Sequence, residues 1–134
     1  MSEFPLKLNN YFFTHQEVVA DPDHKMGDKH PTNNEYNLEV TVSKNTDTCY
    51  GAELTITLNK ELSINPAYAI KISTFGIFDV ISEKTPENID ELAKLSASQL
   101  LISATRERVA ELTARGPWPM CLIDFVNLQL NQKQ

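Results

Sequence analysis

The sequence predicts an α+β fold: a four-stranded antiparallel sheet followed by a long helix and a short C-terminal helix. Apolar residues recur at every second position in several runs before residue 80, which is typical of strands with one polar face. Between residues 85 and 115 the apolar spacing changes to threes and fours, which is typical of a helix. Because strands and helices are segregated along the chain, the pattern favours α+β over α/β.

The first strand is predicted from about residue 6 to residue 19. Its alternation slips at Asn9–Asn10, which indicates a β-bulge. The segment that follows, ADPDHKMGDKHPTNN, is rich in Asp, Pro, Gly and Asn, and it is predicted to be a long loop.

A β-hairpin is the clearest local signal. Two alternating runs, 36–43 and 49–58, are joined by the polar turn residues SKNTDT. The apolar members of the first run are Tyr36, Leu38, Val40 and Val42, and those of the second are Tyr50, Ala52, Leu54, Ile56 and Leu58.

The fourth strand is predicted from Tyr68 to about Ser82. Its second half, FGIFDVI, is apolar on both faces: Phe75, Ile77 and Ile81 lie on one, and Phe78 and Val80 on the other. One face can join the main core, and the other needs a second partner.

The long helix has recognisable ends. Thr85, Pro86 and Glu87 supply an N-cap hydroxyl, a proline at the first helical position and an acid near the positive end of the helix dipole. Gly116 fits the position just past the helix end, and Pro117 prevents its continuation. A second, short helix is predicted from about residue 125 to residue 133.

Length and charge limit the classes of function that the chain can have. The 134 residues predict a single domain, 1–134. The net charge of −6 argues against a nucleic-acid partner. No apolar run is long enough to span a membrane, and the start lacks a signal-peptide pattern, so we expect a cytoplasmic protein. Cys49 and Cys121 are expected to be reduced, with a structural disulfide as the alternative.

A metal site or a catalytic site finds little support. Segment 21–30 contains acidic residues and histidines, but it does not match the calcium-loop template, and we interpret it as a polar surface loop. The chain has no G-x-S-x-G elbow and no glycine-rich phosphate loop. We therefore expect no catalytic residue, no metal and no cofactor.

Two segments, FGIFDVI and PWPMCLIDF, carry more apolar side chains than one sheet face and a helix can absorb. They could be buried in a dimer or tetramer interface, or they could line a peptide-binding groove, where an exposed apolar patch is tolerated because ligands cover it. Both interpretations can hold for different residues.

From about residue 6 to residue 132 the chain resembles the SecB family of protein-export chaperones. The order of elements and two motifs carry the resemblance. The first motif is GIF at 76–78, in the fourth strand. The second is the helix end ATRERVAELTARGPWP, followed by VNL at 126–128.

The resemblance implies a protein without catalytic activity that assembles into a homotetramer, as a dimer of dimers. It also implies that unfolded client polypeptides bind in a hydrophobic groove between the sheet and the loop joining the helices. Carried over by position, the peptide-binding residues are Tyr36, Leu38, Phe75, Ile77, Phe78, Trp118, Pro119, Leu122 and Ile123.

Two roles remain open under this resemblance: protein export, and protection of an antitoxin in a toxin–antitoxin–chaperone system. Export SecB contacts the translocation motor through acidic sheet residues and through a C-terminal helix and tail. Glu35, Glu39 and Glu53 are candidates for the first contact, although ordinary solvation of the polar strand faces explains them equally well. The chain stops seven residues after Asn127, so we expect the second contact to be weak or absent. A small α+β enzyme is a third hypothesis, which no set of residues supports.

Overall fold

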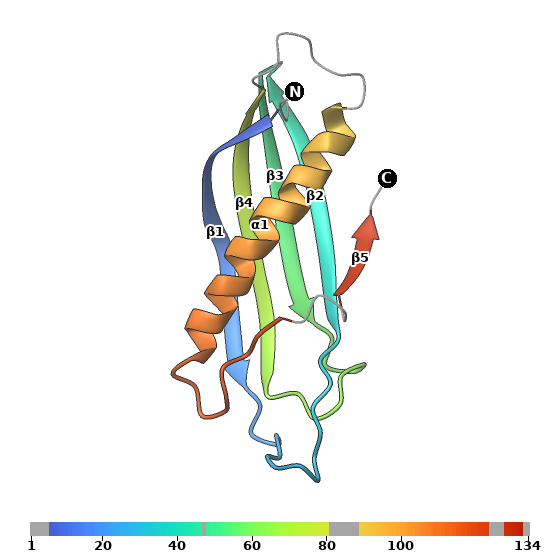
Figure 1. Ribbon diagram of the computed structural model, residues 1–134, viewed down its shortest axis with the longest axis vertical. Helices are drawn as coiled ribbons and strands as arrows, with labels where there is room; N and C mark the ends of the chain where they lie inside the picture. Colours follow the sequence, from blue (N-terminus) through green and yellow to red (C-terminus); the bar gives the residue numbers. More distant parts are fainter. Residues whose placement is uncertain (1–5, 47, 81–88, 124–127, 133–134) are drawn as a thin grey trace.

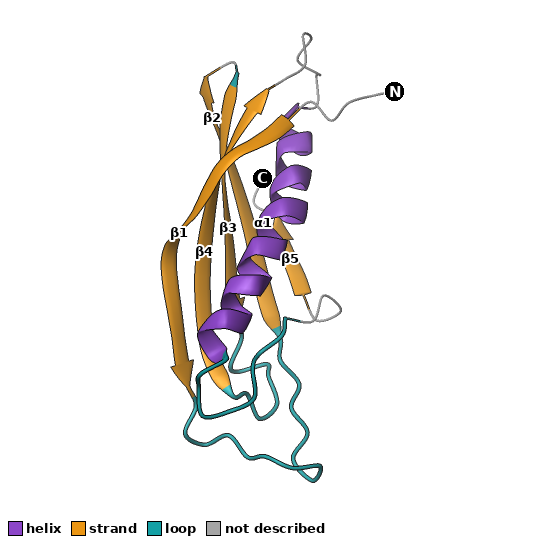
Figure 2. Cartoon of the chain, turned by 60° about the vertical axis from the view of Figure 1, so that its left-hand side comes forward, coloured by secondary structure: helices purple, strands orange, loops and turns teal. Residues whose placement is uncertain are grey.

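The computed structural model confirms the α+β prediction and describes residues 6–46, 48–80, 89–123 and 128–132. A long helix crosses one face of a sheet diagonally (Figure 1) and leaves the other face uncovered (Figure 2). In chain order the elements are β1 (Leu6–Ala20), β2 (Tyr36–Thr46), β3 (Cys49–Leu58), β4 (Tyr68–Val80), α1 (Ile89–Thr113) and β5 (Leu128–Gln132).

The sheet has the order β1-β4-β3-β2-β5. Strands β1 to β4 pair antiparallel, as the sequence predicts. The bulge predicted at Asn9–Asn10 is confirmed, because the pairing of β1 with β4 shifts between Leu8 and Asn10. A second shift, between Phe13 and His15, was not predicted. Strand β1 forms one edge of the sheet, so one side of its backbone has no neighbouring strand in the described chain.

The prediction of a short C-terminal helix is wrong for residues 128–132. These residues form β5, which pairs parallel with the first half of β2, from Tyr36↔Leu128 to Val40↔Gln132. The segment LQLNQ alternates apolar and polar residues, which suits a strand. Pairing with β2 also satisfies backbone groups that an edge strand would leave open. The rest of the predicted helix lies outside the described residues.

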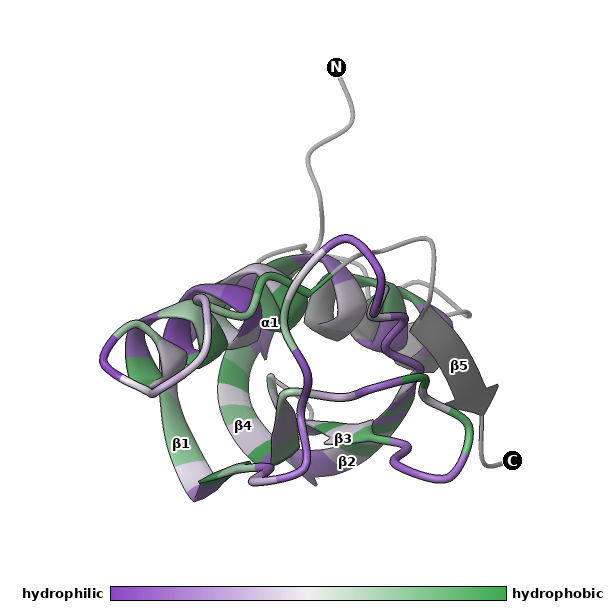
Figure 3. Ribbon diagram, turned by 90° about the horizontal axis from the view of Figure 1, so that it is seen from below, coloured by the Kyte–Doolittle hydropathy of each residue, from purple (hydrophilic) through white to green (hydrophobic). Residues whose placement is uncertain are grey.

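The core lies between α1 and the inner face of the sheet. Figure 3 shows apolar and polar residues alternating along the strands. Phe78 is fully buried under the helix, whereas Phe75 and Ile77 are half-buried on the uncovered face. The glycine of GIF has a packing reason: a Cβ at Gly76 would come within 2.9 Å of Leu101 Cδ2. The largest fully buried apolar side chains are Tyr36, Tyr50, Leu54, Ile56, Ile72, Phe78, Leu101, Val109 and Ile123.

Helix α1 ends at Thr113, before the predicted stop at Gly116. The predicted start at Thr85 to Glu87 lies outside the described residues. In the described chain, no helix is both long and apolar enough to cross a membrane.

A pair of buried threonines fixes the helix against β4. Thr105 Oγ1 donates to the Leu101 carbonyl at 2.7 Å, so it accepts the hydrogen of Thr74 Oγ1, which lies 2.6 Å away. Both side chains are fully buried. The contact joins polar groups in the middle of an apolar layer, so it favours one packing position of the helix over others.

We predict an asymmetric loss of stability at this pair. Thr105→Val leaves the Thr74 hydroxyl without its acceptor and should lower the free energy of unfolding by about 1–3 kcal/mol. Thr74→Val should cost less, because Thr105 still bonds Leu101. The double variant should be at least as stable as Thr105→Val alone. Urea unfolding of all three measures this, and equal losses in the two single variants would contradict the assignment of donor and acceptor.

Candidate functional site

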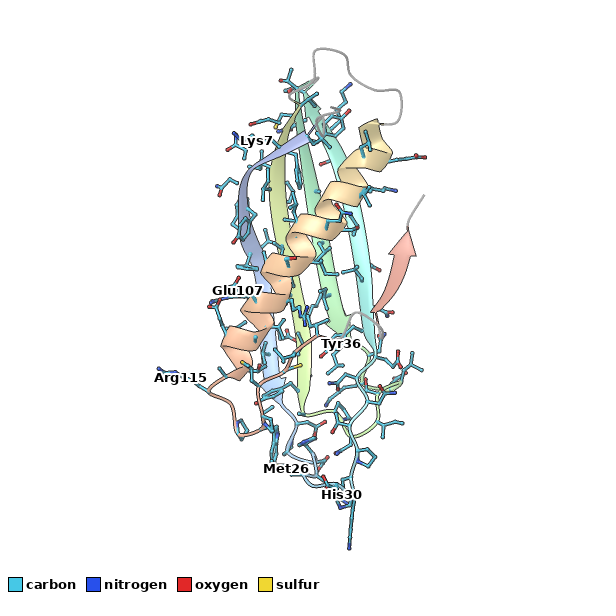
Figure 4. All side chains as sticks on the ribbon, in the orientation of Figure 1. Lys7, Met26, His30, Tyr36, Glu107 and Arg115 are labelled. Carbon is cyan, nitrogen blue, oxygen red and sulfur yellow. The ribbon has the colours of Figure 1, made fainter. Side chains whose placement is uncertain are left out.

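Three loops meet at the end of the sheet where β2 and β4 begin, at the lower end of Figure 1. They are the loop after β1 (21–35), the loop between β3 and β4 (59–67) and the loop after α1 (114–123), which we call the post-helix loop. Figure 4 places Tyr36 at this end of the sheet, with Met26 and His30 in the loop beyond it.

A buried tyrosine hydroxyl anchors the post-helix loop. Tyr68 Oη donates to the carbonyl of Trp118 at 2.9 Å and lies 3.2 Å from the Trp118 backbone N–H, which donates to it. Gly116 packs directly against this ring, and a Cβ there would overlap the Tyr68 hydroxyl. Among the described glycines only Gly27 has a positive φ. Gly116 is therefore required by close approach, and not by the left-handed conformation that a helix stop would use.

A second anchor joins the same loop to β2. Tyr36 Oη lies 2.9 Å from Cys121 Sγ, and the Cys121 N–H donates to Thr113 Oγ1 at 2.8 Å. Burial raises the pKa of the Cys121 thiol, and burial together with the neighbouring thiol raises the pKa of Tyr36. Both groups therefore stay neutral at physiological pH, and the thiol is not activated as a nucleophile.

Trp118 joins the post-helix loop to the loop after β1. Its indole Nε1 donates to the Asp21 carbonyl at 3.0 Å, and its ring meets the His24 ring edge-on at a centroid distance of 5.0 Å. His24 Nδ1 donates to the Asn65 carbonyl at 2.9 Å, because a carbonyl can only accept. The backbone N–H of Asp23 and the Lys60 ammonium hold the pKa of the Asp21 carboxyl below its usual value.

Asn65 fixes the loop after β1 from the opposite side. It adopts a left-handed backbone conformation, with φ of 52°. Its side-chain amide accepts from Lys25 N at 2.9 Å and donates to the carbonyls of Lys25 and His30 at 2.6 and 3.1 Å. The short polar side chain of Asn tolerates this conformation better than most residues, so the position suits it.

These anchors leave a cavity of about 290 Å³ between the post-helix loop and the loop after β1, which we call the loop cavity. Two of its residues, Met120 and Leu122, are large apolar side chains with exposed fractions of 50% and 58%. The lining consists of Leu58, Ala67, Tyr68, Pro119, Met120, Cys121 and Leu122, with His24, Thr32 and Asn34 on the polar side. Such a cavity can receive an apolar side chain. Among the described residues, no group of three or more His, Cys, Asp or Glu side chains could hold a metal ion.

The nine predicted peptide-binding residues do not form one surface. Pro119 and Leu122 are exposed and line the loop cavity. Trp118 is half-buried and does not line the cavity, and Phe75 and Ile77 lie on the uncovered face of the sheet. The other four are buried in the core, where Tyr36 supports the loop from below; they are Tyr36, Leu38, Phe78 and Ile123.

Met120 and the residues of the loop after β1 were not among the predicted binding residues. Met120 belongs to the same apolar run as Leu122. It lies between the predicted residues Pro119 and Leu122, and this position could have identified it. His24, Thr32 and Asn34 carry no such signal in the sequence. They line the cavity because Asn65 and Trp118 fold their loop back over the sheet end.

Comparison with known proteins agrees with this architecture. A family model described as preprotein translocase subunit SecB matches residues 16–134. The protein-export protein SecB of Rhodospirillum centenum is 27% identical over 139 aligned residues, which cover 98% of this chain and 81% of that protein.

Two solved structures show the same fold. The SecB-like chaperone of Mycobacterium tuberculosis, in complex with a ChAD peptide from the HigA1 antitoxin, superposes with a TM-score of 0.68 at 11% identity, over 90% of each chain. A protein of unknown function from Streptococcus agalactiae superposes with a TM-score of 0.61 at 16% identity, over 92% of this chain and all of that one.

The raised pKa of Cys121 predicts a loss of stability in alkali. Above the unfolded pKa of about 9 the thiol of the unfolded chain loses its proton while the buried Cys121 thiol keeps it, so the free energy of unfolding falls as pH rises. Cys121→Ser keeps a hydroxyl near Tyr36 without an ionisation in this range. The free energy of unfolding of the unaltered protein should therefore fall relative to Cys121→Ser by up to about 1.4 kcal/mol per pH unit above pH 9. Parallel pH profiles of the two proteins in urea unfolding would contradict this.

Proposed function

The chain belongs to the SecB family, and we propose that it is an ATP-independent chaperone that holds unfolded or non-native polypeptides in an extended state. The SecB family consists of chaperones and not of enzymes. The observation that carries the proposal is the pair of exposed apolar side chains, Met120 and Leu122, at the mouth of the loop cavity.

The chemistry of the loop cavity suits many partners. Most of its wall is apolar, so it rewards burial of apolar area at roughly 25 cal/mol per Å² and requires no particular donor or acceptor. The unbranched, flexible side chain of Met120 can adapt to ligands of different shape. Unfolded chains expose apolar side chains that folded proteins bury, so such a site favours the unfolded state of its partner.

Protein export is the role that the family description and the Rhodospirillum centenum relative support. In that role the translocation motor is a further proposed partner. Glu39 and Glu53 are exposed on strands β2 and β3, on the face that α1 leaves uncovered, and are the proposed contacts.

Protection of an antitoxin is the second candidate. It is favoured by the likeness in fold to the Mycobacterium tuberculosis chaperone, which was solved with an antitoxin peptide. Both roles use the same property of the site, since an antitoxin with an exposed apolar extension is a dedicated client, whereas exported proteins are a varied set.

We also propose that the chain assembles into a homotetramer. Among the described residues β1 is one edge of the sheet, and its side chains Tyr11, Phe12 and Val19 are exposed. Helix α1 exposes Leu95 and Leu100 on its outer surface. Copies that pair along β1 and through α1 would cover this apolar area and the open edge.

Phe75 and Ile77 belong to a separate, smaller patch. The Phe75 ring stacks on Phe12 at a centroid distance of 5.6 Å, over the position of Gly51 on β3. This patch lies on the other face of the sheet from Phe78, and so away from α1. In the proposal it is secondary to the loop cavity.

Removing the exposed apolar groups of the loop cavity should weaken client binding. We expect the double variant Met120→Ala, Leu122→Ala to bind an unfolded, reduced and carboxymethylated test protein at least ten-fold more weakly, because it loses the burial of two large side chains. Leu62→Ala is the matched control: Leu62 is also apolar, is 61% exposed, and lies outside the cavity. Equal affinity of both variants, measured by fluorescence anisotropy, would reject the site.

Purification from the native host should separate the two roles and measure the assembly. A dedicated chaperone should co-purify with one stoichiometric antitoxin, and an export chaperone with many unfolded secretory proteins.

The mass in solution should be four times the 15.1 kDa of the chain, apart from bound partner. A monomer in light scattering would contradict the proposed assembly.

A further inference from the structure

A second cavity lies beside the loop cavity, and the two share a wall. The second one has a volume of about 450 Å³ and is lined by residues 24–28 and 30–32 together with Pro119. His24, Thr32 and Pro119 line both cavities. The partition between the two spaces is therefore made of His24 and Thr32 from the loop after β1 and Pro119 from the post-helix loop.

Trp118 lines neither cavity but is in contact with this partition. Its ring packs against His24, and Pro119 is its neighbour in the chain. Its indole N–H bonds the Asp21 carbonyl, which ties the post-helix loop to the loop after β1. Trp118 thus holds the two parts of the partition together.

The junction at Trp118 is weaker than the anchors on either side of it. The backbone of Trp118 is bound twice by the Tyr68 hydroxyl, and the loop after β1 is bound by four hydrogen bonds of the Asn65 side chain. A hydrogen bond and a ring contact join the two loops at Trp118. When the loops separate, the break should therefore occur between Trp118 and the pair Asp21 and His24.

The size of the cavities gives this junction a role. About 290 Å³ is at the lower end of ligand sites, which span roughly 300–1,000 Å³, and it suits one large side chain. An extended polypeptide advances about 3.3 Å per residue, so a segment of several residues extends beyond the loop cavity, and the second cavity lies next to it. The joined cavities would offer a mainly apolar part and a mixed part, in which Lys25, Asp28 and His30 lie beside Met26 and Pro31.

Resting on the proposed function, we propose that Trp118 is a clasp that controls entry of an extended client segment. When its indole leaves Asp21 and His24, the partition opens and the two cavities become one groove. The client class is an extended segment with an apolar side chain for the loop cavity, followed by both charged and apolar side chains for the second cavity. Trp118 acts through His24 and Pro119 and is a positioning residue.

Trp118 is the only tryptophan of the chain, so its fluorescence reports directly on the clasp. We use two tryptophan-free ligands: a 12-residue extended peptide with one central Leu-Phe pair among polar residues, and capped N-acetylphenylalaninamide, which fills one cavity only. The peptide should shift the emission of Trp118 to the red as the indole enters water, and the capped residue should leave it unchanged. Binding of the peptide without any shift would overturn the clasp.

Trp118→Phe keeps an aromatic ring and removes the indole N–H. A clasp that has lost one hydrogen bond of about 1 kcal/mol opens more often, so the peptide should bind about five-fold more tightly and associate faster. The affinity of N-acetylphenylalaninamide, measured by NMR titration, should not change. Weaker binding of both ligands would instead make Trp118 a plain wall residue and overturn the proposal.

Two comparisons keep the outcomes apart. Leu62→Ala should leave both affinities unchanged, which shows that the change at Trp118 is local. If the unaltered protein fails to bind the 12-residue peptide, the proposed function is rejected, and the clasp with it. If it binds but Trp118→Phe binds no more tightly, the clasp alone is rejected. Should Trp118→Phe not fold, the fluorescence shift in the unaltered protein decides.

Discussion

The hydroxyl of Tyr68 fixes the path of the chain after α1, and the loop cavity depends on this path. The ring is buried in the core, and its oxygen bonds both the N–H and the carbonyl of Trp118. These bonds satisfy the N–H and the carbonyl of Trp118. Without them, these two backbone groups would lie beside the apolar core with no hydrogen-bond partner. Because residue 118 is held there, Met120 and Leu122 two and four positions later are left at the surface.

In the same arrangement, the residues that stabilise the fold differ from those that are available for binding. Polar groups inside the sheet end are paired with one another, as in Tyr36 with Cys121 and Thr113 with Cys121. Leaving one of them unpaired would cost about 1–3 kcal/mol, a sizeable part of the stability of a small domain. Met120 and Leu122, by contrast, contribute little to the fold while they are exposed, so their apolar area is available to a partner.

The sequence predicted the four strands, the bulge at Asn9–Asn10 and the long helix, because the local spacing of apolar residues indicates each of them. It wrongly assigned residues 128–132 to a helix. Five residues are too few to form a stable helix alone, and these form a strand because they pair with β2. The candidate site was predicted in part. The run around Leu122 pointed to the right loop, but the contribution of His24, Thr32 and Asn34 depends on Asn65 and Trp118, which lie far away in sequence.

The central claim is that the loop cavity receives apolar side chains of non-native polypeptides. Photo-crosslinking tests it most directly: an extended peptide carrying benzoylphenylalanine at its apolar position is bound, irradiated and located by mass spectrometry. The account predicts crosslinks to residues 119–122 and to the facing loop between residues 24 and 34. Crosslinks concentrated on Phe12, Phe75 and Ile77, on the uncovered face of the sheet, would contradict it.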